Sequence, residues 1–184
     1  MRRLRHEEIQ RLQPQALPEV ERHPVVILLE NIRSAHNVGS ILRTADALRL
    51  ESVFCCGFTP DGSHRAVHKA ALGAQDTVPW SHAQDALSLV HRLKKEGYTI
   101  AALEITDTPS DASALTSSCF PLCIVAGNEV TGVSDEVSEE CDIALEIPQY
   151  GVKQSLNVSV ATGVMLYDVV RSFRSLTPSF TDQP

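Results

Sequence analysis

Residues 24–48, PVVILLENIRSAHNVGSILRTADAL, decide the fold of this 184-residue chain. The stretch opens with an unbroken apolar run, Val25–Leu29, which has the length and composition of a strand buried on both faces of a sheet. After a polar loop, the apolar positions repeat at the 3.6-residue period of an amphipathic helix, at Val38, Ile41, Leu42, Ala45 and Leu48. A strand followed directly by a helix is the repeating unit of an α/β domain.

The same alternation continues along the chain. Four more apolar runs of strand length follow, and they are Ser52–Cys56, Tyr98–Leu103, Leu122–Ala126 and Ile143–Ile147. A second helical pattern spans Ala86 to Leu93 and stops at Gly97, which is expected just past the helix end. The sequence therefore predicts an α/β domain with a mostly parallel sheet flanked by helices. We place this domain at residues 25–174 and a C-terminal tail at 175–184.

Residues 1–24 form a polar lead-in that is rich in arginine and proline. Ile9 and Leu12 are its main apolar anchors, so we expect a short helix and then a linker. Near its start, Arg2, Arg3, Arg5 and Arg11 outnumber Glu7 and Glu8, which makes this stretch locally basic. Both a solvated helix end and an arm that contacts a polyanion fit this composition.

Composition narrows the class of protein. Hydrophobic residues make up 43% of the chain and charged residues 21%, which suffices for a core and argues against disorder. No window is apolar enough for a membrane helix, and the charged N-terminus lacks the apolar stretch of a signal peptide, so we expect a cytoplasmic protein. The net charge of −7 argues against broad binding to polyanions but leaves room for a local basic patch.

The five cysteines contain no CxxC pair and are odd in number. A zinc site would need further ligands at close spacing, and a disulfide framework is not implied. We therefore expect no metal, and thiols that are reduced and mostly buried as small hydrophobic side chains.

The last predicted helix, from about Leu156 to Phe173, is apolar on two sides. Leu156, Val160, Val164 and Tyr167 line one side, and Val158, Thr162, Met165 and Val169 line nearly the opposite side. One side can pack on the sheet, but little chain remains to cover the other. We therefore expect a second subunit there, in an isologous dimer, the alternative being a helix buried within its own monomer.

A polar cluster at residues 30–44 follows the first predicted strand, at the edge where open α/β sheets bind ligands. Asn37 suits the N-cap of the helix that follows. Arg43 projects away from the apolar stripe of that helix, and this spacing alone fits an ordinary surface residue as well as a site residue.

Two further clusters follow later strands. The first, AGNEVTG at 126–132, carries glycines that permit a close approach of backbone to a ligand, although alone it reads as a tight strand-to-helix turn. The second, IPQYGVKQSLN at 147–157, ends in a Ser/Asn helix start in which Ser155 alone could be the cap. Neither matches a dinucleotide-binding fingerprint or a Walker loop.

Together the three clusters resemble the ordered motifs of the SpoU/TrmH family, which are RNA ribose 2′-O-methyltransferases of the SPOUT superfamily. The first is Asn37-x-Gly-x-x-x-Arg-Thr, the second Gly127-Asn-Glu-x-x-Gly, and the third Ile147-Pro-x-x-Gly-x-x-x-Ser-Leu-Asn-Val-Ser-x-Ala. The stretch His68-Lys-x-Ala-Leu-Gly-Ala-Gln, ahead of Val78-Pro-Trp, is also similar to family members. The resemblance runs from about Val25 to Arg171.

This resemblance implies a C-terminal trefoil knot, which is a rare exception to unknotted topology. It also implies S-adenosylmethionine as cofactor and a homodimer through the terminal helix, with the active site across the two subunits. The cofactor would be held by Ala126, Gly127, Asn128, Ile147, Pro148, Gln149, Ser155, Leu156 and Asn157.

The resemblance also implies catalytic roles. Arg43 matches the family's catalytic arginine, and because a guanidinium stays protonated, we expect it to bind a substrate phosphate and stabilise the developing alkoxide. That phosphate or a water would take the proton. Asn37 would position Arg43 or the ribose, and Glu129 would orient Arg43 or Asn37 through a charge-assisted hydrogen bond. Ser155 and Asn157 would close the cofactor loop and contact the substrate side.

The implied function is S-adenosylmethionine-dependent methylation of a ribose 2′-hydroxyl in structured RNA, either tRNA or rRNA, with neither DNA nor a membrane as partner. The alternative is a non-catalytic RNA-binding dimer that retains the fold, although a pure binder has no need for the five polar site residues. A nucleotide-binding oxidoreductase lacks its glycine fingerprint. RNA contact would fall on the few available basic residues, which are the N-terminal arginines, Arg33, Arg43, Arg65, Lys69 and Lys153; for Lys153 a solvated loop position fits as well.

Overall fold

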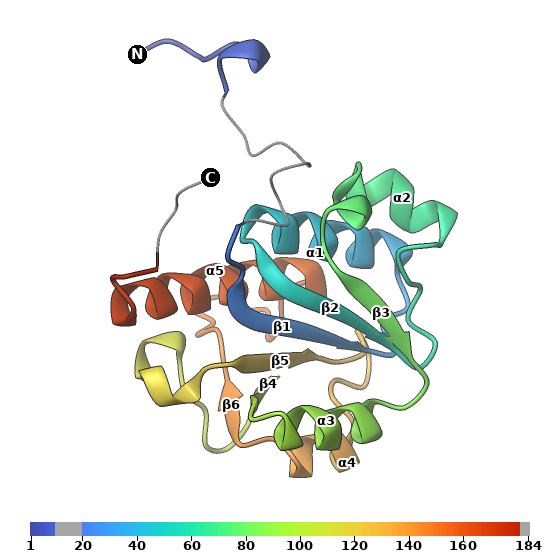
Figure 1. Ribbon diagram of the computed structural model, residues 1–184. Helices are drawn as coiled ribbons and strands as arrows, with labels where there is room; N and C mark the ends of the chain where they lie inside the picture. Colours follow the sequence, from blue (N-terminus) through green and yellow to red (C-terminus); the bar gives the residue numbers. More distant parts are fainter. Residues whose placement is uncertain (10–19, 181–184) are drawn as a thin grey trace.

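One parallel sheet of six strands organises the computed structural model, which describes residues 1–9 and 20–180 (Figure 1). The strands are β1 (His23–Glu30), β2 (Leu50–Cys56), β3 (Trp80–Ala83), β4 (Thr99–Leu103), β5 (Leu122–Ala126) and β6 (Ile143–Leu145). They lie in the order β3-β2-β1-β5-β4-β6, and every neighbouring pair is parallel. The predicted α/β fold with a mostly parallel sheet is confirmed.

Helices cover both faces of the sheet (Figure 1). Above it in the figure lie α1 (Ala35–Ala47), α2 (Arg65–Ala71) and α5 (Val158–Leu176), and below it lie α3 (Ala86–Lys95) and α4 (Asp135–Glu139). Short 3₁₀ turns occupy His6–Glu8, Ala74–Asp76, Ala112–Ala114 and Ser117–Cys119. Gly97 follows α3 with a φ of +91°, as predicted for the residue past its end.

The central strand β1 shows why the apolar runs do not alternate. Ile27 and Leu29 belong to the core cluster shared with α1 and α5, whereas Val26 and Leu28 belong to the cluster shared with α3. All four side chains are buried, because helices cover the sheet on both sides.

Several strands differ from the prediction. β1 and β2 each begin two residues before the predicted runs, at His23 and Leu50. β3 was not predicted, and its physical reason is its place at the sheet edge, where it pairs only with β2 and leaves Ser81 and His82 exposed. β6 ends at Leu145, two residues before the predicted end of the run.

The cysteines behave largely as predicted. All five are free thiols, with Cys55, Cys56 and Cys123 buried and the other two partly buried. Burial raises the pKa of both Cys55 and Cys56 to about 12, so these thiols stay protonated at neutral pH.

In the N-terminal arm, the predicted short helix is the single 3₁₀ turn His6–Glu8. The guanidinium of Arg2 donates two hydrogen bonds to the Glu8 carboxylate, at 2.8 and 2.7 Å. The predicted anchor Leu12 lies outside the described residues. None of the helices in the described ranges is long and apolar enough to cross a membrane.

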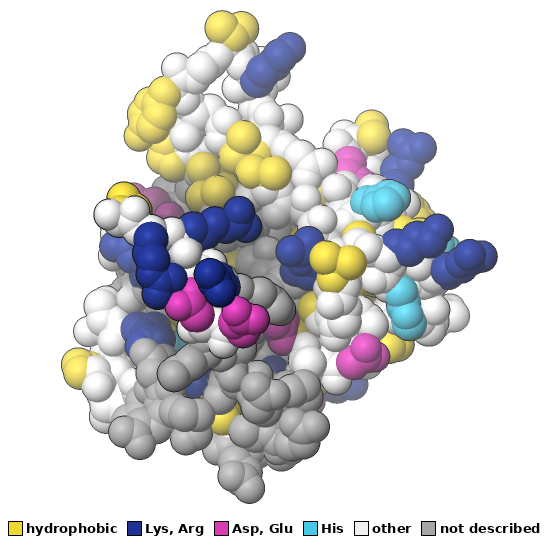
Figure 2. All heavy atoms as spheres, turned by 90° about the horizontal axis from the view of Figure 1, so that it is seen from above, with side chains coloured by type: hydrophobic (Ala, Val, Ile, Leu, Met, Phe, Trp, Pro, Cys, Tyr) yellow, Lys and Arg dark blue, Asp and Glu magenta, His cyan; other side chains and the backbone are white. Residues whose placement is uncertain are grey.

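Helix α5 has the two apolar sides predicted for it, although it spans Val158–Leu176 and so leaves Leu156 in the loop before it. Met165 and Val169 are buried against the sheet, whereas Val160, Val164 and Tyr167 are 51%, 40% and 57% exposed. The described part of the chain therefore covers one side only, and the second subunit expected on the other side stays a prediction. In Figure 2, hydrophobic side chains gather over α5 and the loop before it.

The strand order places β1 and β5 side by side at the centre of the sheet. From β1 the chain runs outward to β2 and β3, whereas β4 and β6 lie beyond β5 on the other side. The loops after β1 and β5 therefore meet at a switch point of the sheet, where α/β proteins bind ligands. The knot expected from the resemblance stays a prediction.

Candidate functional site

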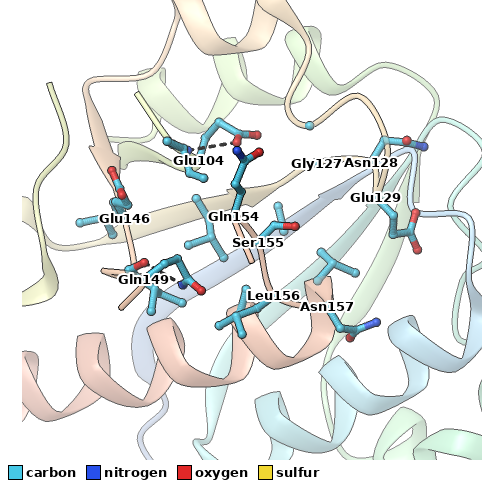
Figure 3. A pocket seen from close by; sticks show the side chains of 18 of the residues that line it. Glu104, Gly127, Asn128, Glu129, Glu146, Gln149, Gln154, Ser155, Leu156 and Asn157 are labelled. Atoms are coloured by element: carbon cyan, nitrogen blue, oxygen red, sulfur yellow. Dashed lines mark hydrogen bonds between the residues drawn. The ribbon is translucent and has the colours of Figure 1, made fainter. Parts of the chain in front are cut away.

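A cavity of about 340 Å³ opens at the carboxyl ends of β4, β5 and β6 (Figure 3). Its walls come from three segments: Leu103–Ile105 after β4, the turn after β5, and the long loop from Leu145 into the start of α5. The volume falls in the range of small-molecule and cofactor pockets.

The structure brings most of the predicted cofactor-binding residues to this cavity. Those that line it are Ala126, Gly127, Asn128, Ile147, Gln149, Ser155, Leu156 and Asn157. Pro148 does not line it and is exposed. The second and third polar clusters, although separated in sequence, therefore lie on one pocket.

A rigid turn after β5 forms one wall of the cavity. The backbones of Asn128 and Gly132 exchange two hydrogen bonds, at 3.0 and 2.9 Å, which close the turn. Gly132 has a φ of +73°, a conformation that favours glycine. The side-chain amide of Asn128 donates to the Asn31 carbonyl at 2.7 Å, which ties this turn to the loop after β1.

Glu104 contributes to the site and was not predicted. It follows β4, and its carboxylate accepts hydrogen bonds from the backbone amides of Val133 (3.2 Å) and Ile105 (3.0 Å). Its position in the sequence could have predicted this, because a charged residue directly after a buried strand lies at the same sheet edge as the other clusters.

The cavity is acidic. Three carboxylates, those of Glu104, Glu129 and Glu146, belong to its lining, and the described lining residues include no Lys, Arg or His. A pocket of this charge favours a cationic ligand and disfavours a phosphate group. Apolar side chains, among them Leu103 and Ile147, supply the rest of the surface.

A chain of polar side chains leads from the cavity to the first cluster. The Asn157 amide donates to Asn37 Oδ1 at 3.2 Å, and Asn37 Nδ2 donates to Glu129 Oε1 at 2.9 Å. The Glu129 carboxylate also accepts from the backbone amides of Arg33 (2.9 Å) and Ser34 (3.2 Å). Residues from three distant parts of the sequence thus converge.

This network keeps Glu129 ionised. Partial burial on its own raises the pKa of the carboxyl group. The hydrogen bonds from Arg33, from the Glu129 amide, from Asn37 and from Ser34 outweigh that effect, so the pKa of Glu129 lies below its usual value.

The prediction that Asn37 caps α1 is wrong. The cap is Ser34, whose extended backbone precedes the helix and whose hydroxyl accepts the Asn37 amide at 3.3 Å. Asn37 lies inside the first turn, and its side chain is therefore available to Glu129 and Asn157.

Asn157, not Ser155, caps α5. Its Oδ1 accepts the backbone amide of Ser159 at 3.0 Å, while its amide nitrogen donates to Asn37. Ser155 lies two residues before the cap and lines the cavity.

Arg43 lies apart from this assembly. Its side chain is exposed on α1, it does not line the cavity, and no described residue forms a hydrogen bond or ion pair with it. The structure therefore places Asn37, Glu129, Ser155 and Asn157 around one site, and Arg43 outside it in the same protomer.

Sequence comparison agrees with this geometry. The profile described as the SpoU rRNA Methylase family matches residues 24–167, most of the chain. The chain belongs to this family. The matched SpoU-family range begins just before the β1 apolar run and ends within α5, so it includes all three polar clusters.

Among its relatives is a Staphylococcus haemolyticus protein assigned to the TrmH family of tRNA/rRNA methyltransferases, which is 36% identical over 146 residues. The match covers 79% of this SpoU-family chain and 58% of the relative, so the chain spans a little over half of that protein's length. A similar protein from Staphylococcus epidermidis is 36% identical over 155 residues, with 84% and 61% of the two chains covered.

Two solved structures share the fold. The A. aeolicus TrmH/SpoU tRNA modifying enzyme has a TM-score of 0.78 and 27% identity, with 91% of this chain and 85% of that chain covered. The AdoMet-bound rRNA methyltransferase from Sinorhizobium meliloti has a TM-score of 0.75 and 27% identity, with 88% and 61% covered.

Proposed function

We propose that this SpoU-family chain transfers a methyl group from S-adenosylmethionine to a ribose 2′-hydroxyl of tRNA or rRNA. The observation that carries the proposal is the acidic, partly apolar cavity, which lies beside the hydrogen-bonded side chains of Asn157, Asn37 and Glu129. Relatives with tRNA/rRNA methyltransferase names and an AdoMet-bound structural neighbour support the coarser part of the proposal, which is AdoMet-dependent methylation of RNA. We place this activity in the cytoplasm, with the RNA it modifies.

The cavity suits the proposed cofactor. S-adenosylmethionine carries a sulfonium and an ammonium group, and when bound it supplies an activated methyl group. Glu104 and Glu146 would balance that positive charge, while Leu103, Ile147 and Leu156 would contact the apolar parts. The backbone of the turn at Gly127 can approach a ligand closely because the residue lacks a Cβ.

The polar chain would hold the acceptor ribose. Asn37 Oδ1 is oriented by the amide of Asn157, and Asn37 Nδ2 is held by the ionised Glu129. An amide nitrogen has two hydrogens and an amide oxygen two lone pairs, so Asn37 retains capacity to bind a hydroxyl group. Fixing that hydroxyl beside the cavity provides the alignment on which methyl transfer depends.

Arg43 would act on the RNA, across a dimer. The exposed apolar side of α5, with Val160, Val164 and Tyr167, supports an isologous interface through this helix. Helix α1 packs against α5, with Thr44 Oγ1 3.7 Å from where a Cβ on Gly163 would lie. Arg43, next to Thr44, can then serve the cavity of the partner subunit, where it would bind a phosphate and stabilise the developing alkoxide.

The test combines labelled transfer with the chemistry of the product. Protein, S-adenosylmethionine labelled in the methyl group, and bulk tRNA or rRNA are incubated, and the RNA is hydrolysed in alkali. A 2′-O-methyl group blocks alkaline cleavage, so label in alkali-resistant dinucleotides supports ribose methylation, whereas label in mononucleotides alone contradicts it.

Arg43→Ala tests the role of the arginine. We expect it to reduce transfer to background while the Kd for S-adenosylmethionine, measured by calorimetry, is unchanged, because the contacts proposed for Arg43 are with an RNA phosphate and the developing alkoxide and not with the cofactor. Arg92→Ala, on α3 at the other face of the sheet, is the matched control and should retain transfer. Unchanged turnover in Arg43→Ala would contradict the mechanism, and binding of RNA without any transfer by the parent protein would favour the non-catalytic alternative.

A further inference from the structure

A basic surface with one exposed aromatic ring lies beside the polar chain of the site. We call it the α1–α2 surface, and its exposed members are Arg33, His36, Arg43, Phe58, His64, Arg65, His68 and Lys69. In Figure 2, Lys, Arg and His side chains stand together on the right of the view, where α2 lies in Figure 1.

Close helix packing holds this surface together. α2 crosses α1 at Gly39, where an added Cβ would lie 2.5 Å from the Cβ of Ala70 and 2.8 Å from the carbonyl oxygen of Val67. Only a glycine allows this approach, so α1 and α2 are in close contact and the exposed cationic side chains of both helices are carried on one packed pair.

Phe58 is fixed to the same loops that build the site. Its backbone amide donates to Asn31 Oδ1 at 3.3 Å, and the Asn31 carbonyl accepts the side chain of Asn128. Two residues after Asn31, the Arg33 amide donates to Glu129. Phe58 is therefore linked through two short segments to the carboxylate that holds Asn37.

The exposure of Phe58 is built into the backbone. The preceding Gly57 has a φ of +63°, and a Cβ there would lie 2.0 Å from Asn31 Oδ1. The following Thr59 is buried, with its hydroxyl donating to the Leu29 carbonyl and accepting the Ile32 amide, both at 2.9 Å. Both neighbours are anchored, yet the ring between them is 62% exposed. An aromatic ring that faces solvent from an anchored backbone is suited to contact a ligand.

The charge of this surface is opposite to that of the whole chain. The segments from residue 31 through α1 and from residue 57 through α2 contain four Lys and Arg residues and only two carboxylates, although the whole chain has a net charge of −7. Both carboxylates are engaged, since Asp46 accepts from Thr77 at 2.5 Å and Asp61 accepts from Ser63 at 2.8 Å. The surface complements a polyanion.

We propose that the α1–α2 surface binds single-stranded RNA next to the methylated nucleotide, and that Phe58 stacks on one unpaired base. This inference rests on the proposed function for the identity of the polyanion. Arg33, Arg65 and Lys69 hold the phosphates on either side. The bases of an A-form duplex are stacked on each other and offer no free face to an aromatic ring, so the substrate strand is open at this point, as in a loop or at an end.

Binding to a short mixed-sequence single-stranded oligoribonucleotide, and to the duplex of the same sequence, tests the proposal by fluorescence anisotropy. Phe58→Ala and Phe58→Leu weaken single-strand binding about 5- to 150-fold, the range measured for base–aromatic stacking, and leave duplex binding unchanged. Phe58→Trp, which keeps an aromatic ring at this position, binds the single strand like the parent. Lys69→Ala weakens both forms and lowers the salt slope by about one.

Leu72→Ala is the matched control, because Leu72 is 70% exposed at the end of α2 but has no aromatic face; it should bind both RNAs like the parent. Phe58→Leu that binds the single strand as tightly as the parent, or Phe58→Ala that weakens both forms equally, overturns the inference. Labelled transfer by the parent separates the two proposals. If the parent methylates RNA but the Phe58 variants bind the single strand as the parent does, only the stacking proposal is refuted. If the parent shows no methyl transfer but the Phe58 variants lose single-strand binding as expected, only the methyl-transfer proposal is refuted.

Discussion

Replacing Gly127 with alanine disturbs the turn on which the cavity wall depends. An added Cβ would lie 2.1 Å from both the Gly132 carbonyl carbon and the Val133 nitrogen. These are backbone atoms, so no side-chain rotation can relieve the overlap. The turn must move by more than 1 Å to reach ordinary contact, since carbon atoms sit about 3.5–4.0 Å apart at their optimal separation.

The cost follows from the bonds that such a movement strains. Two backbone hydrogen bonds close the turn between Asn128 and Gly132, and each is worth about 1 kcal/mol. Steric overpacking adds about 1–3 kcal/mol. After partial relaxation we expect Gly127→Ala to lose about 3 kcal/mol of unfolding free energy, which corresponds to roughly 10 °C in Tm for a chain of this size.

Thermal unfolding measures the loss of stability, and calorimetric titration with S-adenosylmethionine measures the affinity for the cofactor. We expect this affinity to fall at least about tenfold, because the displaced turn lines the cavity. Gly151→Ala is the matched control for stability, since a Cβ there meets nothing within 4 Å. If Gly127→Ala unfolds at the temperature of the parent and binds the cofactor equally well, the close approach described here does not shape the pocket.

Two further outcomes follow from exposed groups. If α5 forms the proposed dimer interface, replacing both Val160 and Val164 with aspartate should raise the dissociation constant of that dimer at least about 100-fold, because half-exposed valines gain about 1 kcal/mol each on burial and carboxylates lose it. Equal sedimentation of parent and variant would exclude this interface. The depressed pKa of Glu129 stabilises the folded state above the ordinary carboxyl pKa of 4.5, and this contribution is lost as pH falls through the lower folded-state pKa. The urea midpoint of the parent should therefore drop more between about pH 5 and pH 3 than that of Glu129→Gln, and parallel pH profiles would show that Glu129 contributes nothing.

The parts of the fold that depend on burial could be predicted from the sequence. The run Val25–Leu29 is apolar because helices cover both faces of β1, and the two sides of α5 follow directly from helical periodicity. The three polar clusters could be placed at one sheet edge because the carboxyl ends of parallel strands share that edge. β3 was missed because an edge strand with exposed Ser81 and His82 has little apolar signal.

The details of the site depend on which of several competing polar groups takes each hydrogen bond. Ser34, Asn37, Ser155 and Asn157 are all good capping residues, and composition does not rank them. In the structure Ser34 and Asn157 cap the two helices, and this choice frees Asn37 to bridge Asn157 and Glu129. The position of Arg43 relative to a cavity cannot be predicted from motif spacing, because it depends on how whole helices and subunits pack.

The distribution of charge fits the proposal that this acidic chain acts on RNA. Carboxylates gather at the cavity, where Glu104, Glu129 and Glu146 suit a cationic methyl donor, whereas the exposed α1–α2 surface carries Lys and Arg. Asn37 lies between them. Its neutral side chain donates a hydrogen bond to Glu129 of the acidic loop, and its backbone belongs to helix α1 of the basic surface. A cavity of uniform positive charge would attract RNA but repel the donor, and a uniformly acidic surface would do the reverse. Separating the two signs across a single amide would allow the two proposed ligands to meet, so the net charge of −7 is compatible with a polyanionic substrate.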